Sequence, residues 1–413
     1  MTGWLVRIAL FALFLIPVVI EQYSVNYLFV AFAAFLALQA RGLKKPSMLI
    51  LVAIAVYVAI FLCSIAIDLF GGGNLALRRS VSFAIFISIF AFSVVDFEEA
   101  DVRAFKIALI SVAVAISLQS LLGFFLAGGN TVGFGLKNVV GSQRYGFVYL
   151  LALFVLIRFP TTKRWELIAK YLAGYVIMTG VLLTFSRASI FSLGLVLPLY
   201  FIAPLLTKSG RSVEGGKRLA RRLAIGLAYC AALYVVLPVT FEYYDQSIFN
   251  RYTVAVEETL AGAPVEEVFV PAGSEGARLT IWSAVAQYVS DHPFLGGGYL
   301  GSWSLNSVVT GSAHNQYFDV LMRTGFVGTV IYLLVLGSIF LFLWRKDQGL
   351  FWGGLTILVY GLVHETFKES QGAFILAFLI GMYATDRRSR SASSQISMDG
   401  SSGQAWDKID GHA

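Results

Sequence analysis

Long apolar runs, separated by short polar or glycine-rich connections, set the pattern of this sequence. A helix that crosses a bilayer needs about 20 apolar residues. Runs near that length predict twelve membrane-spanning helices, at 4–20, 24–40, 48–67, 80–95, 104–127, 144–158, 166–184, 187–206, 219–241, 317–344, 350–364 and 370–384. The predicted fold class is all-α, a polytopic membrane protein.

One polar stretch interrupts this pattern, at 242–316, and predicts a large loop outside the membrane between the ninth and tenth helices. Within it, residues 278–291 have apolar side chains at helical spacing. This predicts an amphipathic helix on the membrane surface, with Trp282 and Tyr288 at the headgroup level. The chain then divides into helices one to nine (1–241), the outer loop (242–316), helices ten to twelve (317–384) and a basic, Ser-rich tail predicted to be disordered (385–413).

Composition supports the membrane assignment. Hydrophobic residues make up 58% of the chain and charged residues 13%, whereas an ordinary soluble domain has about a quarter of its residues charged. This excludes a soluble globular protein. The two cysteines, Cys63 and Cys230, both fall inside predicted helices, so we expect no disulfide framework.

Basic residues orient the helices. With the N-terminus in the cytoplasm, the connections on that side hold eighteen Lys and Arg, counting Arg221 and Arg222 at the membrane edge, against eight on the other side. Short cytoplasmic loops carry such an excess. The net charge of +7 is then explained by topology and by attraction to anionic lipid, and it gives no reason to expect a nucleic-acid partner.

Among the basic residues on the outer side, where the charge rule disfavours them, three arginines at the membrane edge are candidates for function. Arg78 and Arg79 open the fourth predicted helix. They either reach lipid phosphate with their long side chains or contribute to a site for an anionic substrate. Arg187 lies in the short turn 184–189, at or below the membrane surface. A charge there usually faces a polar cavity or a partner, which favours a functional role over a plain helix anchor.

The outer loop holds two further candidates. Arg278 falls in the first turn of the predicted amphipathic helix, where the helix dipole disfavours a cation, and this favours ligand binding. His314 stands beside Asn315 at the end of the loop. A histidine is suited to proton transfer near neutral pH, although a lone interfacial histidine is more often structural. The acidic residues of 242–276 have no His or Cys beside them, which favours a solvated face over a metal site.

Several short motifs follow one another in a fixed order. They are Thr184-Phe185-Ser186-Arg187-Ala188, Arg278-Leu279-Thr280-Ile281-Trp282, Asp291-His292-Pro293-Phe294-Leu295-Gly296-Gly297-Gly298, His314-Asn315-Gln316-Tyr317 and Thr324-Gly325-Phe326-Val327-Gly328. The ordered set resembles the signature of the O-antigen ligase and O-antigen polymerase family. The twelve-helix layout with one large outer loop is similar to that family too.

The resemblance implies a bacterial inner-membrane glycosyltransferase whose active site faces the periplasm, acting in lipopolysaccharide or exopolysaccharide biosynthesis. The donor that it implies is an oligosaccharide linked to undecaprenyl diphosphate, and the acceptor is lipid A core or another glycan. The functional residues of the family match Arg187, Arg278 and His314 here. The family uses no nucleotide sugar, no metal and no other cofactor.

The chemistry of these three residues suits that reaction. Breaking the anomeric bond releases a lipid diphosphate, whose charge Arg187 and Arg278 would stabilise through paired hydrogen bonds. His314 would take the proton of the acceptor hydroxyl or orient it, in a direct displacement with inversion. The turn 364–369 resembles an acidic element of the family, whose carboxylates either pair with an active-site arginine or cap helix ends. Supporting residues are expected to be Asn315, Glu365, Glu369, Arg78 and Arg79.

Several activities stay open at this stage. A ligase moves a finished glycan onto lipid A core, and the single long loop favours it slightly; a polymerase joins lipid-linked repeat units. From a different class, a flippase or transporter would move the same lipid-linked glycan across the bilayer, although the halves show no clear repeat of the kind common in transporters. A non-enzymatic scaffold for polysaccharide export would tolerate loss of all three residues.

Overall fold

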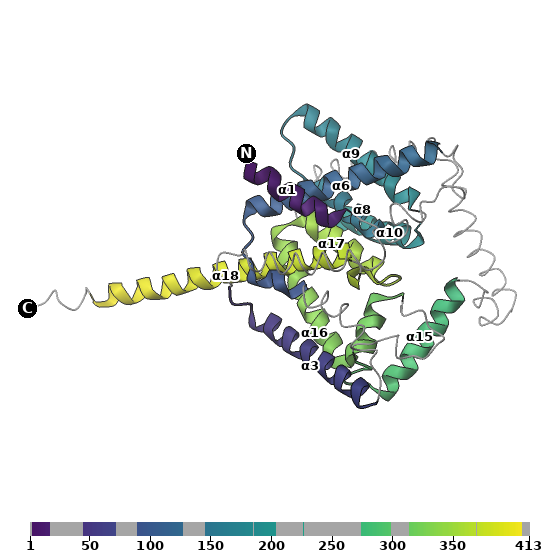
Figure 1. Cartoon of the computed structure of the whole chain (residues 1–413). Coiled ribbons are helices and arrows are strands. Elements are labelled where there is room, and N and C mark those ends of the chain that lie inside the picture. Colours follow the sequence, from purple (N-terminus) through teal and green to yellow (C-terminus); the bar gives the residue numbers. More distant parts are fainter. Residues whose placement is uncertain are drawn as a thin grey trace, which may run out of the picture.

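The computed structural model describes residues 2–16, 44–71, 89–126, 145–184, 186–203, 226, 274–298, 314–368 and 370–406, and for 274–280 and 392–406 it describes the backbone alone. All regular structure within these ranges is helical (Figure 1). The α-helices are α1 (Thr2–Leu15), α3 (Met48–Phe70), α6 (Glu99–Leu126), α8 (Gly146–Arg158), α9 (Arg164–Leu183), α10 (Arg187–Ile202), α15 (Ser274–Asp291), α16 (Gln316–Lys346), α17 (Gln348–Tyr360) and α18 (Ser370–Trp406). Two short 3₁₀ turns are η1 (Phe92–Val94) and η6 (Thr366–Lys368).

Helices occupy most of each predicted apolar run that falls within the described ranges. The run 350–364 is an exception at its end, because α17 stops at Tyr360 and residues 361–364 form a turn. In this part of the chain, α3, α6, α9 and α16 are long and apolar enough to cross a membrane, and α1, α8 and α10 are apolar but shorter. The chain is therefore an all-α membrane protein. The runs 24–40, 219–241 apart from residue 226, and most of 80–95 lie outside the described residues, so the number of twelve spans and the outer loop stay predictions.

The short helix α8 lies at the centre of the bundle. Every residue from Gly146 to Leu156 is buried, and α6, α9, α10 and α17 pack around it (Figure 1). Its 13 residues reach only about 20 Å, which is less than the roughly 30 Å of a bilayer core. Helix α17 approaches α8 at Gly353, where an added Cβ would lie 2.6 Å from Leu151 Cδ1. Glycine at this position permits the close contact.

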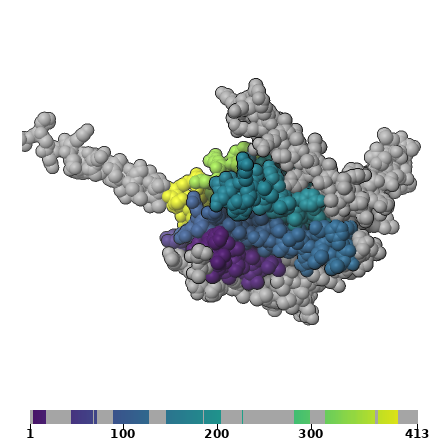
Figure 2. Space-filling view, turned by 90° about the horizontal axis from the view of Figure 1, so that it is seen from above, coloured from purple at the N-terminus to yellow at the C-terminus, as the bar shows by residue number. Residues whose placement is uncertain are grey.

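Aromatic rings join α1, α6 and α18. Phe105 and Phe378 stack with their ring centroids 4.0 Å apart, and Phe11 meets both rings edge-on at 5.8 and 5.5 Å. Such pairs contribute about 0.5–1.5 kcal/mol each beyond the area they bury. The space-filling view shows α1 (purple) lying along α6 (blue) (Figure 2).

Charged side chains gather where α18 passes η1. Arg388 donates to the carbonyl oxygen of Val95 at 2.8 Å and pairs with Asp96 at 2.6 Å. Lys346, in the last turn of α16, pairs with Asp386 of α18 at 3.2 Å. We call this part of the bundle the basic end. Helices α16 and α18 both begin at the opposite end of the bundle. Helix α17 begins at the basic end and runs back to that opposite end.

Helix α18 extends well beyond its buried part. It runs to Trp406 and leaves the body of the molecule (Figure 1, yellow). The tail predicted to be disordered from 385 is therefore helical as far as Trp406. No proline interrupts 370–406, and extending an existing helix is far easier than nucleating a new one. Residues 407–413 lie outside the described residues.

The amphipathic helix predicted in the outer loop is confirmed as α15. Its apolar face packs against Met322 of α16, through the buried side chains of Ile281, Val285 and Val289. The ring of Trp282 meets that of Phe318 edge-on at 5.4 Å. The prediction that this apolar face lies on the membrane surface is therefore wrong. Protein rather than lipid covers it, because the same spacing of apolar residues serves either kind of contact.

A turn after α15 fastens this helix to a break in α16. Gly325 interrupts α16 with φ 60° and ψ −165°. Across the break, the Gly297 amide donates to the carbonyl of Met322 at 2.7 Å, and the Phe326 amide donates to the carbonyl of Pro293 at 2.8 Å. Positive φ is accessible to glycine at little cost. The glycine-rich turn therefore supplies partners for backbone groups that the break would otherwise leave unsatisfied.

Candidate active site

The start of α10 carries the first candidate, Arg187. Ser186 precedes it as the helix N-cap, and the Ser186 hydroxyl oxygen accepts a hydrogen bond from the Ser189 amide at 3.3 Å. Gly146 of α8 lets this turn approach closely, since a Cβ there would lie 2.0 Å from Ser189 Oγ. Arg187 itself is partly exposed. The local structure thus fixes the backbone of the Ser-Arg motif while leaving the guanidinium within reach of solvent.

The start of α16 carries the second candidate, His314. Asn315 caps this helix, because its Oδ1 accepts hydrogen bonds from the amides of Tyr317 and Phe318 at 2.9 and 3.1 Å. His314 lies just before the cap with φ 49°, a left-handed conformation that few non-glycine residues adopt. Its side chain is partly exposed. The His-Asn motif is therefore a sharp turn that leads into a capped helix.

Residues 361–367, which we call the clasped loop, wrap around the start of α16. The Gln316 amide donates to the Gly361 carbonyl at 2.7 Å, and the Asn315 side-chain amide donates to the Leu362 carbonyl at 2.8 Å. At the other end of the loop, the Phe367 amide donates to Gln316 Oε1 at 3.0 Å. Both ends of the loop are thus held by Asn315 and Gln316.

Tyr360 links this loop to the Ser-Arg motif. It is the last residue of α17, and its hydroxyl lies 3.2 Å from the Ser186 hydroxyl, next to Arg187. The loop that begins after Tyr360 binds the His-Asn motif, as described above. Two motifs far apart in sequence are therefore brought to the same end of the bundle, opposite the basic end.

The third candidate, Arg278, lies in α15. This helix begins at Ser274, so Arg278 falls in the second turn, and the argument from an unfavourable first-turn dipole does not hold. Its side chain lies outside the described residues. The backbone of Arg278 is one helical turn before Trp282, and Trp282 packs on Phe318 in the first turn of α16. The structure thus brings this part of α15 next to the start of α16.

Of the five predicted supporting residues, the structure describes the side chains of Asn315 and Glu365. Asn315 acts as a helix cap and as a fastener of the clasped loop. Glu365 is only 6% exposed, so it lies inside the loop rather than on its surface. Arg78, Arg79 and Glu369 lie outside the described residues, and their roles stay predictions.

Sequence reasoning missed two residues of this region. One is Tyr360, which contacts Ser186. The other is His364, which is partly exposed and has its ring centroid 5.4 Å from that of Tyr360. A signal for His364 was present, because the adjacent pair His364 and Glu365 ends a long apolar run. Nothing in the sequence singled out Tyr360, since a tyrosine at the end of an apolar helix is common at membrane interfaces.

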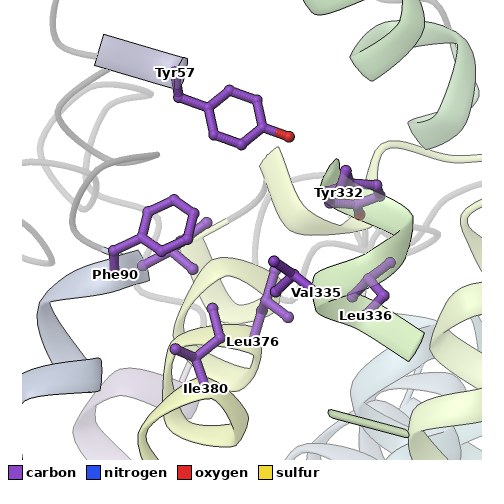
Figure 3. A pocket seen from close by; sticks show the side chains of 8 residues that line it. Tyr57, Phe90, Tyr332, Val335, Leu336, Leu376 and Ile380 are labelled. Atoms are coloured by element: carbon purple, nitrogen blue, oxygen red, sulfur yellow. The ribbon is translucent and has the colours of Figure 1, made fainter. Parts of the chain in front are cut away.

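A small cavity lies elsewhere, between α3, α16, α18 and the segment before η1 (Figure 3). Its lining is apolar, and Tyr57, which contributes to it, donates its hydroxyl to the Gly328 carbonyl at 3.0 Å. Tyr332, on the opposite wall, is roughly four turns along α16 from its start. A glycan needs hydrogen-bonding partners for its hydroxyls, so this cavity does not suit one.

A comparison with protein families supports the assignment of this site. Residues 172–333 match the family model described as O-antigen ligase. This segment of the chain is similar to an O-antigen ligase domain. The resemblance noted in the sequence is thereby confirmed, and the matched segment includes Arg187, Arg278 and His314 but ends before the clasped loop. A search of curated proteins gave no match.

Proposed function

We propose that this chain transfers a glycan from undecaprenyl diphosphate to lipid A core, at the periplasmic face of the bacterial inner membrane. The observation that carries the proposal is the meeting of the Ser-Arg and His-Asn motifs. Tyr360 contacts Ser186, and the loop after it binds Asn315. These contacts support a site in which Arg187 would bind the diphosphate and His314 would act as the base for the acceptor.

The arrangement of charges supports the periplasmic side. The site lies at the end of α16 opposite Lys346, and Lys346 belongs to the basic end with Arg388. Basic residues favour the cytoplasmic side of a membrane protein. With the basic end in the cytoplasm, the starts of α10 and α16 face the periplasm, where finished lipid-linked glycans are used.

The proposed reaction is a single displacement at the anomeric carbon. The oxygen of an acceptor hydroxyl forms a bond to that carbon, and the bond from the carbon to the diphosphate oxygen breaks. The acceptor proton passes to His314, and the bonding electron pair leaves with the diphosphate. Arg187 and Arg278 stabilise the charge that develops on the leaving group through charge-assisted hydrogen bonds. Attack opposite the leaving group inverts the anomeric configuration.

Reconstitution of the purified full chain tests the proposal. The protein in lipid vesicles is given an undecaprenyl diphosphate-linked oligosaccharide, and lipid A core or a lipid-linked repeat unit is supplied in separate reactions. We expect glycan on lipid A core. Lengthened lipid-linked chains would instead identify a polymerase. Movement of the donor across the bilayer without transfer to any acceptor would overturn the transferase proposal in favour of a flippase.

Substitutions in the same assay test the roles of the residues. Arg187→Ala, Arg278→Ala and His314→Ala should each lower transfer by about a hundredfold or more. His292→Ala is the matched control, because this exposed histidine stacks on Tyr288 with centroids 4.7 Å apart, beyond the far end of α15 from Arg278. Normal transfer by His314→Ala would remove the proposed base.

A further inference from the structure

The clasped loop presents one ionisable side chain and buries another. Glu365 is 6% exposed, and Thr366 after it is fully buried. His364 is partly exposed. The sequence draws attention to the carboxylate, but within the described part of this loop the side chain that a substrate can reach is the imidazole. The hydrogen bonds at both ends of the loop hold its backbone in one conformation, in which Glu365 faces inward and His364 is partly exposed.

His364 lies on the Arg187 side of the site. Its ring centroid is 5.4 Å from that of Tyr360, and the Tyr360 hydroxyl is 3.2 Å from the hydroxyl of Ser186, the residue before Arg187. One aromatic ring therefore separates His364 from the Ser-Arg motif. This chain of contacts leads from His364 to the residue before Arg187, the cation assigned to phosphate.

A diphosphate bound near the start of α16 would need positively charged groups beside it. Asp319 is buried and pairs with Arg323 at 2.8 Å, so the charge of Arg323 is largely compensated within its own helix. Glu365 adds a buried carboxylate behind the loop. A diphosphate that enters this region brings at least two further negative charges. An imidazolium that donates a hydrogen bond to a phosphate oxygen would offset part of that charge.

We propose that His364 contacts the diphosphate of the donor, beside Arg187. This inference rests on the proposed function, and it assigns a role to a residue beyond the segment that matches the family model. The contact forms in the ground state as well as in the transition state. It therefore acts on donor binding more than on the chemical step.

Binding of inorganic pyrophosphate tests this contact without requiring transfer. Titration calorimetry on the full chain in lipid nanodiscs compares the wild type with His364→Ala, His364→Gln and His364→Lys. A lost charge-assisted hydrogen bond should weaken binding roughly tenfold to a hundredfold in the Ala and Gln variants. Lys retains a positive charge and should recover most of the affinity. His292→Ala, an exposed histidine away from the site, should bind as the wild type does.

Transfer kinetics give a second readout. In His364→Ala the KM for the lipid-linked donor should rise by a similar factor, while kcat stays within about threefold of the wild-type value. If the role of His364 were merely structural, the Ala variant would lose kcat as well as show a raised KM, and Lys would restore neither value. Gln replaces Ala in this comparison if the Ala variant fails to fold, since it preserves a polar side chain of similar reach.

The outcomes separate this inference from the proposed function. Wild-type pyrophosphate affinity and donor KM in both His364→Ala and His364→Gln would overturn the contact, even with active enzyme. Failure of the wild type to bind pyrophosphate at millimolar concentration would overturn it as well. If the wild type binds pyrophosphate through His364 but transfers no glycan, the proposed function fails and the contact stands.

Discussion

The side-chain amide of Asn315 donates a hydrogen bond of 2.8 Å to the main-chain carbonyl of Leu362. The other side-chain atom of the same group, Oδ1, caps α16. One residue thus performs two tasks, since it ends the His-Asn turn and holds the clasped loop. The amide can do both because it has a carbonyl oxygen that accepts for the cap and an NH₂ group that donates to the loop.

Replacement of Asn315 separates these two tasks. Asn315→Asp keeps the capping oxygen but cannot donate to Leu362, so it should cost about 1 kcal/mol of stability; Asn315→Ala loses both and should cost about 2 kcal/mol. Transfer should fall strongly in both variants. Thermal unfolding in detergent and the transfer assay measure the two effects. Normal transfer by Asn315→Asp would show that the loop contact is dispensable.

The break in α16 predicts opposite effects for two glycines of one helix. At Gly325 (φ 60°) an added Cβ would lie 2.4 Å from the Phe294 carbonyl, so Gly325→Ala should destabilise the protein by about 2 kcal/mol or more. At Gly337 nothing lies within 4 Å, so Gly337→Ala should be neutral or stabilising by up to about 1 kcal/mol. The melting temperatures of the two variants measure this difference. Equal changes in melting temperature for Gly325→Ala and Gly337→Ala would contradict the proposed strain at the break.

The hydroxyl of Tyr360 is predicted to position the Ser-Arg motif. Tyr360→Phe removes the hydroxyl that contacts Ser186 and should cost about 0.5–1.5 kcal/mol, with a severalfold rise in donor KM. Tyr57→Phe is the control, because it removes a comparable bond to the Gly328 carbonyl away from the site. It should lower the melting temperature similarly and leave KM unchanged. An unchanged KM in Tyr360→Phe would mean that the bond does not position Arg187.

A substitution at the basic end tests whether stability and donor binding are separate. Arg388 binds Asp96 and the carbonyl of Val95, so Arg388→Ala should lower stability by about 1–3 kcal/mol. The site lies at the other end of the helices, so donor KM should not change. A raised KM in a well-folded Arg388→Ala protein would show that the two ends are coupled.

The helices could be predicted from the sequence because the signal is local. The sixth apolar run, 144–158, corresponds to α8 at Gly146–Arg158, since length and apolarity alone decide that a segment is helical in a membrane protein. The partner of an apolar face is not local. The spacing in 278–291 predicts α15 correctly, yet it cannot distinguish a lipid surface from Met322 and its neighbours in α16.

Only part of the candidate site could be predicted from the sequence, because only part of it has a local signal. Arg187 and His314 stand out because polar groups at the edges of apolar runs are few. The clasped loop does not stand out in the sequence. It is held mainly by hydrogen bonds to main-chain groups, such as the Gly361 and Leu362 carbonyls, and every sequence has main-chain carbonyls. The contrast between exposed His364 and buried Glu365 follows from how that loop folds, and neighbouring positions in a sequence carry no such information.

The clasped loop also sets when the enzyme can become active during its synthesis. A ribosome makes the Ser-Arg and His-Asn motifs well before it reaches Leu362 and Phe367, whose backbone groups hold the start of α16. Until the last two helices enter the membrane, Asn315 and Gln316 lack these partners. A chain whose insertion stops early therefore contains the Ser-Arg and His-Asn motifs but lacks the hydrogen bonds that join the start of α16 to the clasped loop.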